Sequence, residues 1–155
     1  MKTHTGALAG TGLRIAIVAS RFNDAIVTDL VAGARSRLQR LGVDDDETEL
    51  VWVPGAFEIP AAAKAMAATG RFDAVVCLGA VIRGATPHFD QVAAQAAAGC
   101  ARVGLDTGVP TIFGVLTTDT IEQALERAGT KAGNKGEDAA EAAVEMVNVL
   151  RSVAG

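Results

Sequence analysis

The chain has 155 residues and a mass of 15.8 kDa, and half of its residues are apolar. This length suits one domain with a substantial buried core. The net charge is −4 and no cluster of lysines and arginines breaks the acidic balance, which excludes nucleic acid as an expected partner. No apolar run approaches the roughly 18 residues that a membrane span requires, so we expect a soluble, cytoplasmic protein with no membrane partner.

Residues 1–12 form a short polar leader with little core-forming material. We expect this leader either to be disordered or to add an edge strand to a neighbouring subunit. Residues 13–155 are expected to form one domain. In this region, apolar runs rich in β-branched residues alternate with stretches of helical period, which is typical of an α/β domain with a mostly parallel sheet.

The first half of this pattern predicts two strands, each followed by a helix. The apolar run at residues 13–20 predicts a strand, and a helix over residues 24–41 places its apolar residues on one face before Gly42 ends it. A second strand is predicted over residues 49–55. The helix that follows it covers residues 60–70 and has a proline in its first turn, where proline is favoured.

The second half continues the alternation with the most apolar strand of the chain. Residues 73–82 are apolar almost throughout, as expected of a central parallel strand buried on both faces, and a helix begins near Pro87. A fourth strand is predicted over residues 109–118. A capping-box pattern then opens a helix over residues 120–128, and a polar loop leads to a last helix over residues 137–153.

Ligands of open parallel sheets bind at the carboxyl ends of the strands, and the turn after the third strand is the most informative of these ends. We expect Thr86 to be the N-cap of the next helix, Pro87 its first residue and His88 part of its first turn. Free N–H groups and the helix dipole at this point predict an anion site, above all for phosphate. Gly84 and Ala85 would let such a ligand approach the main chain.

The same positive field disfavours an imidazolium, which suggests that His88 stays neutral near pH 7 and can accept a proton. We therefore hypothesise general acid/base catalysis by His88 beside a bound phosphate. The alternative is a histidine that only packs or caps at a helix start.

Other candidates are weaker when taken singly, and each has a structural alternative. Phe22 and Phe113 fall at strand ends, where their rings could stack on a planar heterocycle or join the core. Glu58 could accept hydrogen bonds from ligand hydroxyls or complement a helix dipole. Arg127, near a helix end, could bind phosphate or be solvated, and the lysines of the following glycine-rich loop have the same ambiguity.

The two cysteines, Cys77 and Cys100, lie in apolar stretches with no paired spacing. We interpret them as buried thiols rather than as disulfide partners or metal ligands. One plausible site histidine and two scattered cysteines cannot supply the usual ligand set of a zinc hydrolase, so no metal is expected.

The chain resembles the 6,7-dimethyl-8-ribityllumazine synthase family over most of its length, from about Leu8 to Ser152. The resemblance rests on five motifs in this order: ASRFND, VWVPGAFEIP, CLGAVIRGATPHFD, GVPTIFGVLTTDTIEQALERAGTKAGNKG and AAEAAVEMVNVLRS. It implies a flavodoxin-like three-layer α/β/α sandwich with a central four-stranded parallel sheet. It also implies condensation of 5-amino-6-(D-ribitylamino)uracil with 3,4-dihydroxy-2-butanone 4-phosphate, the penultimate step of riboflavin biosynthesis, without metal or organic cofactor.

The resemblance further implies a role for individual residues, with His88 as the proton-transfer residue. The other implied contacts are Phe22 stacked on the pyrimidine; Ala56, Phe57 and Glu58 at the ribityl chain and ring; the main chain of Ala80, Val81 and Ile82 at the uracil; Ala85 and Thr86 at the phosphate; Phe113 and Arg127 from the adjacent subunit, the arginine at the phosphate; and Lys135 near both substrates.

Family resemblance implies a pentamer with its sites between subunits, and the short loop at residues 129–136 resembles that of members that form icosahedral shells. Riboflavin synthase is a candidate partner enzyme. A catalytically inactive homologue that forms a shell, or that binds flavin or lumazine, remains the alternative. A flavodoxin-like electron carrier fits less well, because it would need a loop rich in serine, threonine and glycine where this chain has SRFND.

Overall fold

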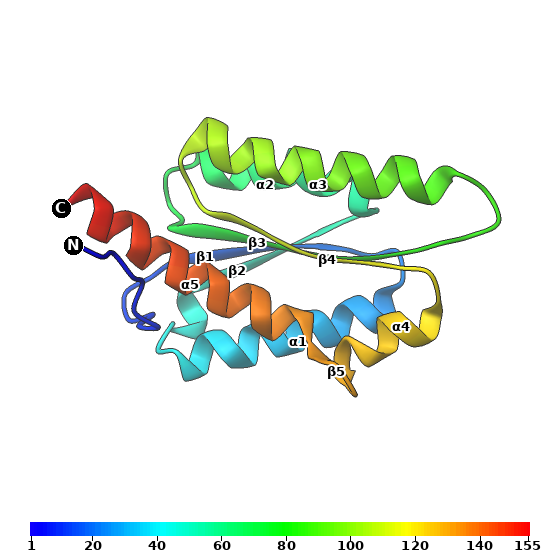
Figure 1. The fold of residues 1–155 in the computed structure, drawn as a ribbon, viewed down its shortest axis with the longest axis horizontal. Helices are drawn as coiled ribbons and strands as arrows, with labels where there is room; N and C mark the ends of the chain where they lie inside the picture. Colours follow the sequence, from blue (N-terminus) through cyan, green and yellow to red (C-terminus); the bar gives the residue numbers. More distant parts are fainter.

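Four parallel strands form the central sheet of the computed structural model, which describes residues 1–155 (Figure 1). Their spatial order is β2-β1-β3-β4, so β1 and β3 are interior and β2 and β4 are edges. The register is parallel throughout. The four strands are β1 (Ile15–Ser20), β2 (Thr48–Val53), β3 (Ala74–Ile82) and β4 (Thr111–Thr118). The predicted α/β fold with a four-stranded parallel sheet is confirmed.

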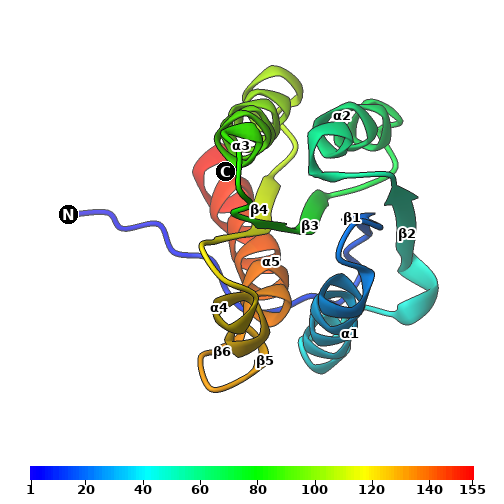
Figure 2. The same cartoon turned by 90° about the vertical axis from the view of Figure 1, so that its right-hand side faces the viewer.

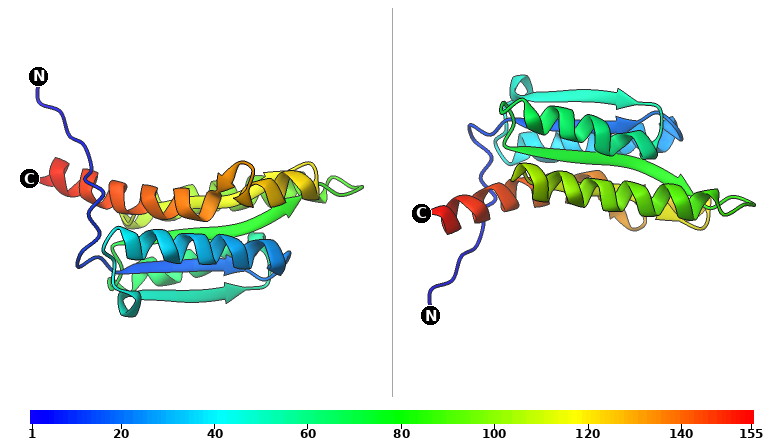
Figure 3. Two further views of the ribbon diagram at one scale, coloured as in Figure 1. Left: turned by 90° about the horizontal axis from the view of Figure 1, so that it is seen from below. Right: turned by 90° about the horizontal axis from the view of Figure 1, so that it is seen from above.

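Helices cover both faces of the sheet, which gives three layers (Figures 1 and 3). The layer on one face consists of α2 (Ile59–Ala68) and α3 (His88–Thr107). The layer on the other face consists of α1 (Asp24–Arg40), α4 (Ile121–Glu126) and α5 (Lys135–Ala154). Short 3-10 turns, η1 (Asp45–Glu47) and η2 (Ala56–Glu58), flank β2 on either side.

Alternate residues of the interior strands enter two separate cores. In β1, Ile15 and Ile17 pack in the core that α1 and α5 cover, whereas Ala16 and Val18 pack in the core under α2 and α3. All six residues of β1 are buried. Burial on both faces is why this strand is a continuous apolar run rather than an alternating one.

The segment before α5 differs from the predicted polar loop. Residues Ala128–Thr130 (β5) and Gly133–Asn134 (β6) form a small antiparallel ladder, which ends α4 two residues earlier than predicted. Asn134 caps α5, because its side-chain oxygen accepts hydrogen bonds from the N–H groups of Gly136 (2.8 Å) and Glu137 (3.2 Å). The helix therefore starts at residue 135 rather than 137.

A glycine allows α1 and α5 to pack closely at this point. A Cβ atom added at Gly136 would clash with the backbone carbonyl of Leu30 in α1.

The predicted capping box of α4 is present: Thr120 accepts a hydrogen bond from the N–H of Gln123 (3.2 Å), and the Gln123 side chain accepts one from the N–H of Thr120 (3.3 Å).

Residues 1–12 contain no helix or strand, and the N-terminus extends away from the body of the molecule (Figures 2 and 3). The last helix tethers part of this leader, since the Asn148 side chain donates hydrogen bonds to the carbonyls of Ala7 (2.6 Å) and Ala9 (3.0 Å). Pairing of the leader with a neighbouring subunit stays a prediction.

None of the helices combines the length and apolar character that a membrane crossing demands.

Candidate active site

A cavity of about 740 Å³ opens at the carboxyl ends of the strands, between η2 and the first turns of α3. We call it the apolar cavity, because eight of its 15 lining residues are hydrophobic. The predicted site residues that line it are Phe22, Ala56, Phe57, Glu58, Ala80, Val81, Ile82, Thr86 and His88. Ala85 does not line it. The structure thus brings together residues from three separate motifs of the sequence.

Backbone pairing beyond the ends of β1 and β2 brings two of these motifs together. The N–H of Arg21 donates to Val53 (2.8 Å) and that of Phe22 donates to Pro54 (3.1 Å), so the two segments stay adjacent after the strands end. Phe22 and Phe57 are left 70% and 58% exposed. Two aromatic rings exposed at the mouth of a cavity provide stacking surface for a planar ligand.

Asn23 connects the turn after β1 to the end of β3. It is the only non-glycine residue with positive φ (62°), a conformation that asparagine tolerates better than most residues. Its side-chain amide donates a hydrogen bond to the carbonyl of Ala80 (2.9 Å). Asn23 was not among the predicted site residues, although an asparagine close after a strand end is a recognisable turn signal.

The start of α3 differs from the prediction by one residue. Thr86 is not the N-cap: the cap is Pro87, without any side-chain hydrogen bond, and His88 is the first helical residue. Pro87 has ψ near 0°, outside the helical range, which delays the start of the helix. The N–H groups of Asp90 and Gln91 bond to the carbonyl of Pro87, whereas those of His88 and Phe89 have no backbone acceptor.

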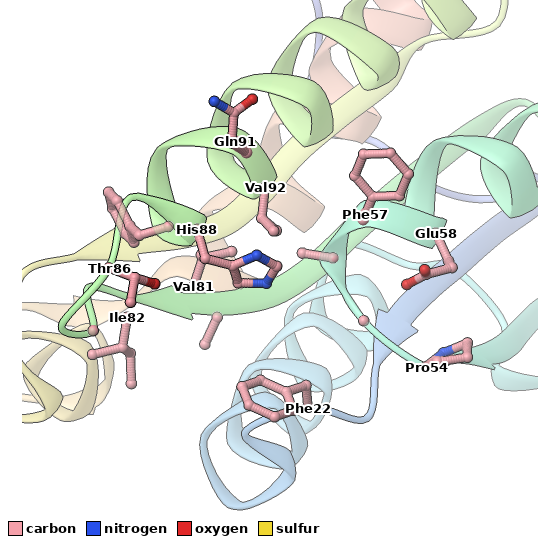
Figure 4. A pocket seen from close by; sticks show the side chains of 15 residues that line it. Phe22, Pro54, Phe57, Glu58, Val81, Ile82, Thr86, His88, Gln91 and Val92 are labelled. Atoms are coloured by element: carbon pink, nitrogen blue, oxygen red, sulfur yellow. The ribbon is translucent and has the colours of Figure 1, made fainter.

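His88 extends from the first turn of α3 into the apolar cavity, above β3 (Figure 4). Phe57 and Glu58 of η2 lie across the cavity from it, and Phe22 lies on the side of α1. No lysine or arginine lines this cavity, and Glu58 is its one acidic residue. A phosphate bound beside His88 would therefore find helix N–H groups but no cationic side chain within this cavity.

Apart from Ala85, which lines neither cavity, the remaining predicted residues lie in a second cavity of about 440 Å³, which we call the charged cavity. Phe113, Arg127, Lys135 and Asp138 line it, together with residues of β4. The Arg127 guanidinium donates a hydrogen bond to the carbonyl of Gln123 (2.9 Å), which fixes it at the end of α4. The structure thus separates the predicted cationic residues from the predicted proton-transfer residue.

Both cysteines are buried free thiols, as predicted. Cys77 lies in β3 and Cys100 in α3, within the core under α2 and α3. A hydrogen bond with Cys100, together with burial, raises the pKa of the Cys77 thiol well above its usual range. A thiol that stays protonated is a poor nucleophile, so Cys77 is a core residue.

The strand order β2-β1-β3-β4, with a ligand-sized cavity at the carboxyl edge of the sheet, defines a flavodoxin-like α/β protein that binds small molecules. A model of the 6,7-dimethyl-8-ribityllumazine synthase family matches residues 12–151. The chain belongs to this family. Its reaction is the condensation of 5-amino-6-(D-ribitylamino)uracil with 3,4-dihydroxy-2-butanone 4-phosphate to 6,7-dimethyl-8-ribityllumazine in riboflavin biosynthesis.

Proposed function

We propose that each catalytic site combines the apolar cavity of one chain with the charged cavity of a second copy. The observation that carries this proposal is the separation of charge: Arg127 and Lys135 line one cavity, whereas His88 and the α3 N-terminus line the other. A phosphate dianion held beside His88 would share its cavity with the Glu58 carboxylate and no cationic side chain, so it requires cationic partners as well as backbone N–H groups. A second copy would supply them.

In this proposal, the ribitylaminouracil occupies the apolar cavity. Phe22 stacks on its ring, and Ala56, Phe57 and Glu58 hold the ribityl chain. The main chain of Ala80, Val81 and Ile82 pairs with the uracil. The exposed rings of Phe22 and Phe57 and the apolar lining support this assignment, since they offer surface to a planar heterocycle.

The butanone phosphate binds at the turn before α3 in the same proposal. Ala85, Thr86 and the free N–H groups of the first turn surround the phosphate, and Arg127 of the second copy completes its binding. Phe113 and Lys135 of that copy lie beside the substrates. The uncapped start of α3 supports this assignment, because no side chain of the chain itself occupies these donors.

The chemistry consists of proton transfers around two C–N bond formations. The 5-amino group adds to the ketone and water leaves, which gives a Schiff base. The phosphate group is then eliminated as inorganic phosphate, and the ribityl-bearing nitrogen closes the second ring with loss of another water. His88 accepts and returns protons during these steps, and no step requires a nucleophile from the protein.

Most of the acceleration should come from holding the two substrates together. Effective molarities of well-oriented reactants reach roughly 10⁵ to 10⁸ M. One acid/base group typically contributes about 10² to 10⁴. The division of labour that we propose is therefore positioning first and proton transfer by His88 second.

A complementation experiment tests the shared site. His88→Ala impairs the apolar cavity, and Arg127→Ala impairs the charged cavity. The two variants are co-assembled, and their activity is assayed by lumazine fluorescence against a protein-free blank. We expect the mixed assembly to be more active than the two separate variants added together, because about a quarter of the subunit interfaces in a random mixture join an intact apolar cavity to an intact charged cavity. The matched control is a mixture of His88→Ala with Phe22→Ala, which alter the same cavity and should not complement. No recovery in confirmed mixed assemblies would contradict the proposal.

The proposal extends to assembly. We propose a pentamer that packs further into an icosahedral shell, which could hold riboflavin synthase, and in which residues 1–12 pair with β2 of a neighbour. The half-exposed Leu50 and Trp52 on this open edge support the pairing, since an uncovered apolar edge strand invites another strand. Two free thiols suit the reducing cytoplasm, where we place the reaction. Light scattering that shows only a pentamer-sized species would contradict the shell.

A further inference from the structure

Arg83 directly follows β3 and begins the turn that leads to α3. Its Nε donates a hydrogen bond to Asp119 Oδ1 (2.9 Å), in the loop between β4 and α4. Its Nη1 lies 3.3 Å from Asp90 Oδ1, and its guanidinium carbon lies 4.4 Å from the centre of the Phe89 ring. One side chain therefore contacts both the first turn of α3 and the loop after the neighbouring strand.

Arg83 has more partners than an arginine in an ordinary surface ion pair. A single exposed pair contributes little, because its side chains move freely and solvent screens their charges. Here a planar guanidinium is held by two carboxylates and by an aromatic face. The hydrogen bond with Asp119 raises the pKa of Arg83, so its charge is constant over all working pH values.

The turn that Arg83 begins has few other supports. Residues 83–88 are largely exposed, and α3 starts without a side-chain cap. A Cβ atom added at Gly84 would meet open space. Phe89, the ring on which Arg83 stacks, lines the apolar cavity beside His88, whereas Arg83 itself does not line it.

We propose that Arg83 is a positioning residue, which fixes the first turn of α3 against the loop after β4 and thereby holds His88 and the phosphate-binding turn in place. This inference rests on the proposed function of that turn as the phosphate site. Arg83 acts through Phe89 and Asp90 and does not contact substrate, because its guanidinium is already engaged by two carboxylates.

The expected effect falls on one substrate more than on the other. A small displacement of a binding turn lowers the rate steeply, so we expect Arg83→Ala to lower kcat/KM for the butanone phosphate about 10- to 100-fold. The KM for the ribitylaminouracil should change little, because η2 and Phe22 bind it. Arg83→Lys keeps the positive charge but loses the planar guanidinium group with its two-pronged hydrogen bonding. This variant should therefore recover only part of the lost kcat/KM.

The chain offers a matched control at the opposite edge of the sheet. Arg71 also stacks on an adjacent phenylalanine, Phe72 (4.6 Å), and forms an ion pair with Glu49. Arg71→Ala removes the same kinds of contact far from the cavity and should leave both KM values and kcat unchanged.

Asp119→Asn separates positioning from direct phosphate binding. If Arg83 positions the turn, loss of its Asp119 partner raises the KM for the butanone phosphate. If Arg83 binds phosphate itself, releasing it from Asp119 leaves that KM unchanged or lowers it, which would overturn the inference. Asp119→Asn and Arg83→Lys also keep the test open if Arg83→Ala does not assemble.

Amide hydrogen exchange of residues 84–91 without substrate separates this inference from the proposed function. We expect faster exchange in Arg83→Ala than in the wild type and in Arg71→Ala. Unchanged exchange would overturn the positioning role of Arg83. Faster exchange with unchanged KM for the butanone phosphate would overturn the phosphate site at this turn instead.

Discussion

The two cavities of this chain offer different chemistry to a ligand. The apolar cavity follows the interior strands and presents exposed aromatic rings, a histidine and one carboxylate. The charged cavity lies beside β4, an edge strand, and presents Arg127, Lys135 and Asp138. One suits a planar heterocycle, and the other suits an anion.

Under the proposal of a shared site, this difference means that one copy of the chain alone would be a poor catalyst. The reaction needs a heterocycle and a phosphate ester in contact, and each cavity is suited to only part of that pair. Arg83, the cationic residue at the end of β3, is engaged by Asp119 and Asp90 and does not line the apolar cavity. The shared site that we propose would resolve this separation and would make activity depend on assembly.

The largest effect is expected for His88, the proposed proton-transfer residue of the apolar cavity. His88→Ala should lower kcat by about 10² to 10⁴, the usual contribution of one acid/base group, while a rate above the protein-free blank remains. Lumazine fluorescence at saturating substrates measures it. The matched control is His4→Ala, since His4 is the other histidine and bonds only to Ser152. Complete loss of activity in an assembled His88→Ala variant would refute positioning as the larger contribution.

A smaller effect is expected from the charged cavity. Arg127→Ala should lower kcat/KM for the butanone phosphate about 10- to 100-fold, because a hydrogen bond to a charged group contributes about 1.5–3 kcal/mol. The KM for the ribitylaminouracil should stay near the wild-type value. Steady-state assays with each substrate varied in turn separate the two. Arg102→Ala, a change at an arginine exposed on α3, is the control. An equal loss of kcat/KM for both substrates would contradict the assignment of the phosphate group to the charged cavity.

The smallest effect is expected for the aromatic rim of the apolar cavity. Phe22→Ala should raise the KM for the ribitylaminouracil about 10-fold, since stacking of a base on an aromatic ring is worth about 1–3 kcal/mol. The KM for the butanone phosphate should change less. Leu105→Ala serves as control, because Leu105 is a large apolar residue that is exposed on α3 away from both cavities. If only the KM for the butanone phosphate changed, the heterocycle would not stack on Phe22.

The interior strands were predictable, because burial on both faces produces a continuous apolar run in the sequence. Residues 15–19 and 74–82 are continuous apolar runs, and the structure has β1 and β3 there as interior strands. The capping box of α4 was also predictable, since its two partners are three residues apart. The β5–β6 ladder was not, because three- and two-residue strands carry no periodicity.

Local signals also located the turn after β3 but not its details. A Gly-Ala-Thr-Pro sequence after an apolar run predicts a helix start, yet the ψ angle of Pro87 decides which residue begins the helix. Nothing in the sequence pairs Arg83 with Asp119, which lie 36 residues apart. Contacts of this kind depend on which strands become neighbours, and spacing along the chain does not encode that order in a readable form.

The alternation of strands and helices, the burial of both cysteines and the motifs that mark the family were all predictable, because they follow from short-range patterns of polarity and residue type. The division of the predicted site residues between two cavities was not predictable from such patterns. Strand order places β4 at an edge and β1 beside β3, and this long-range arrangement separates Arg127 from His88 on the same chain.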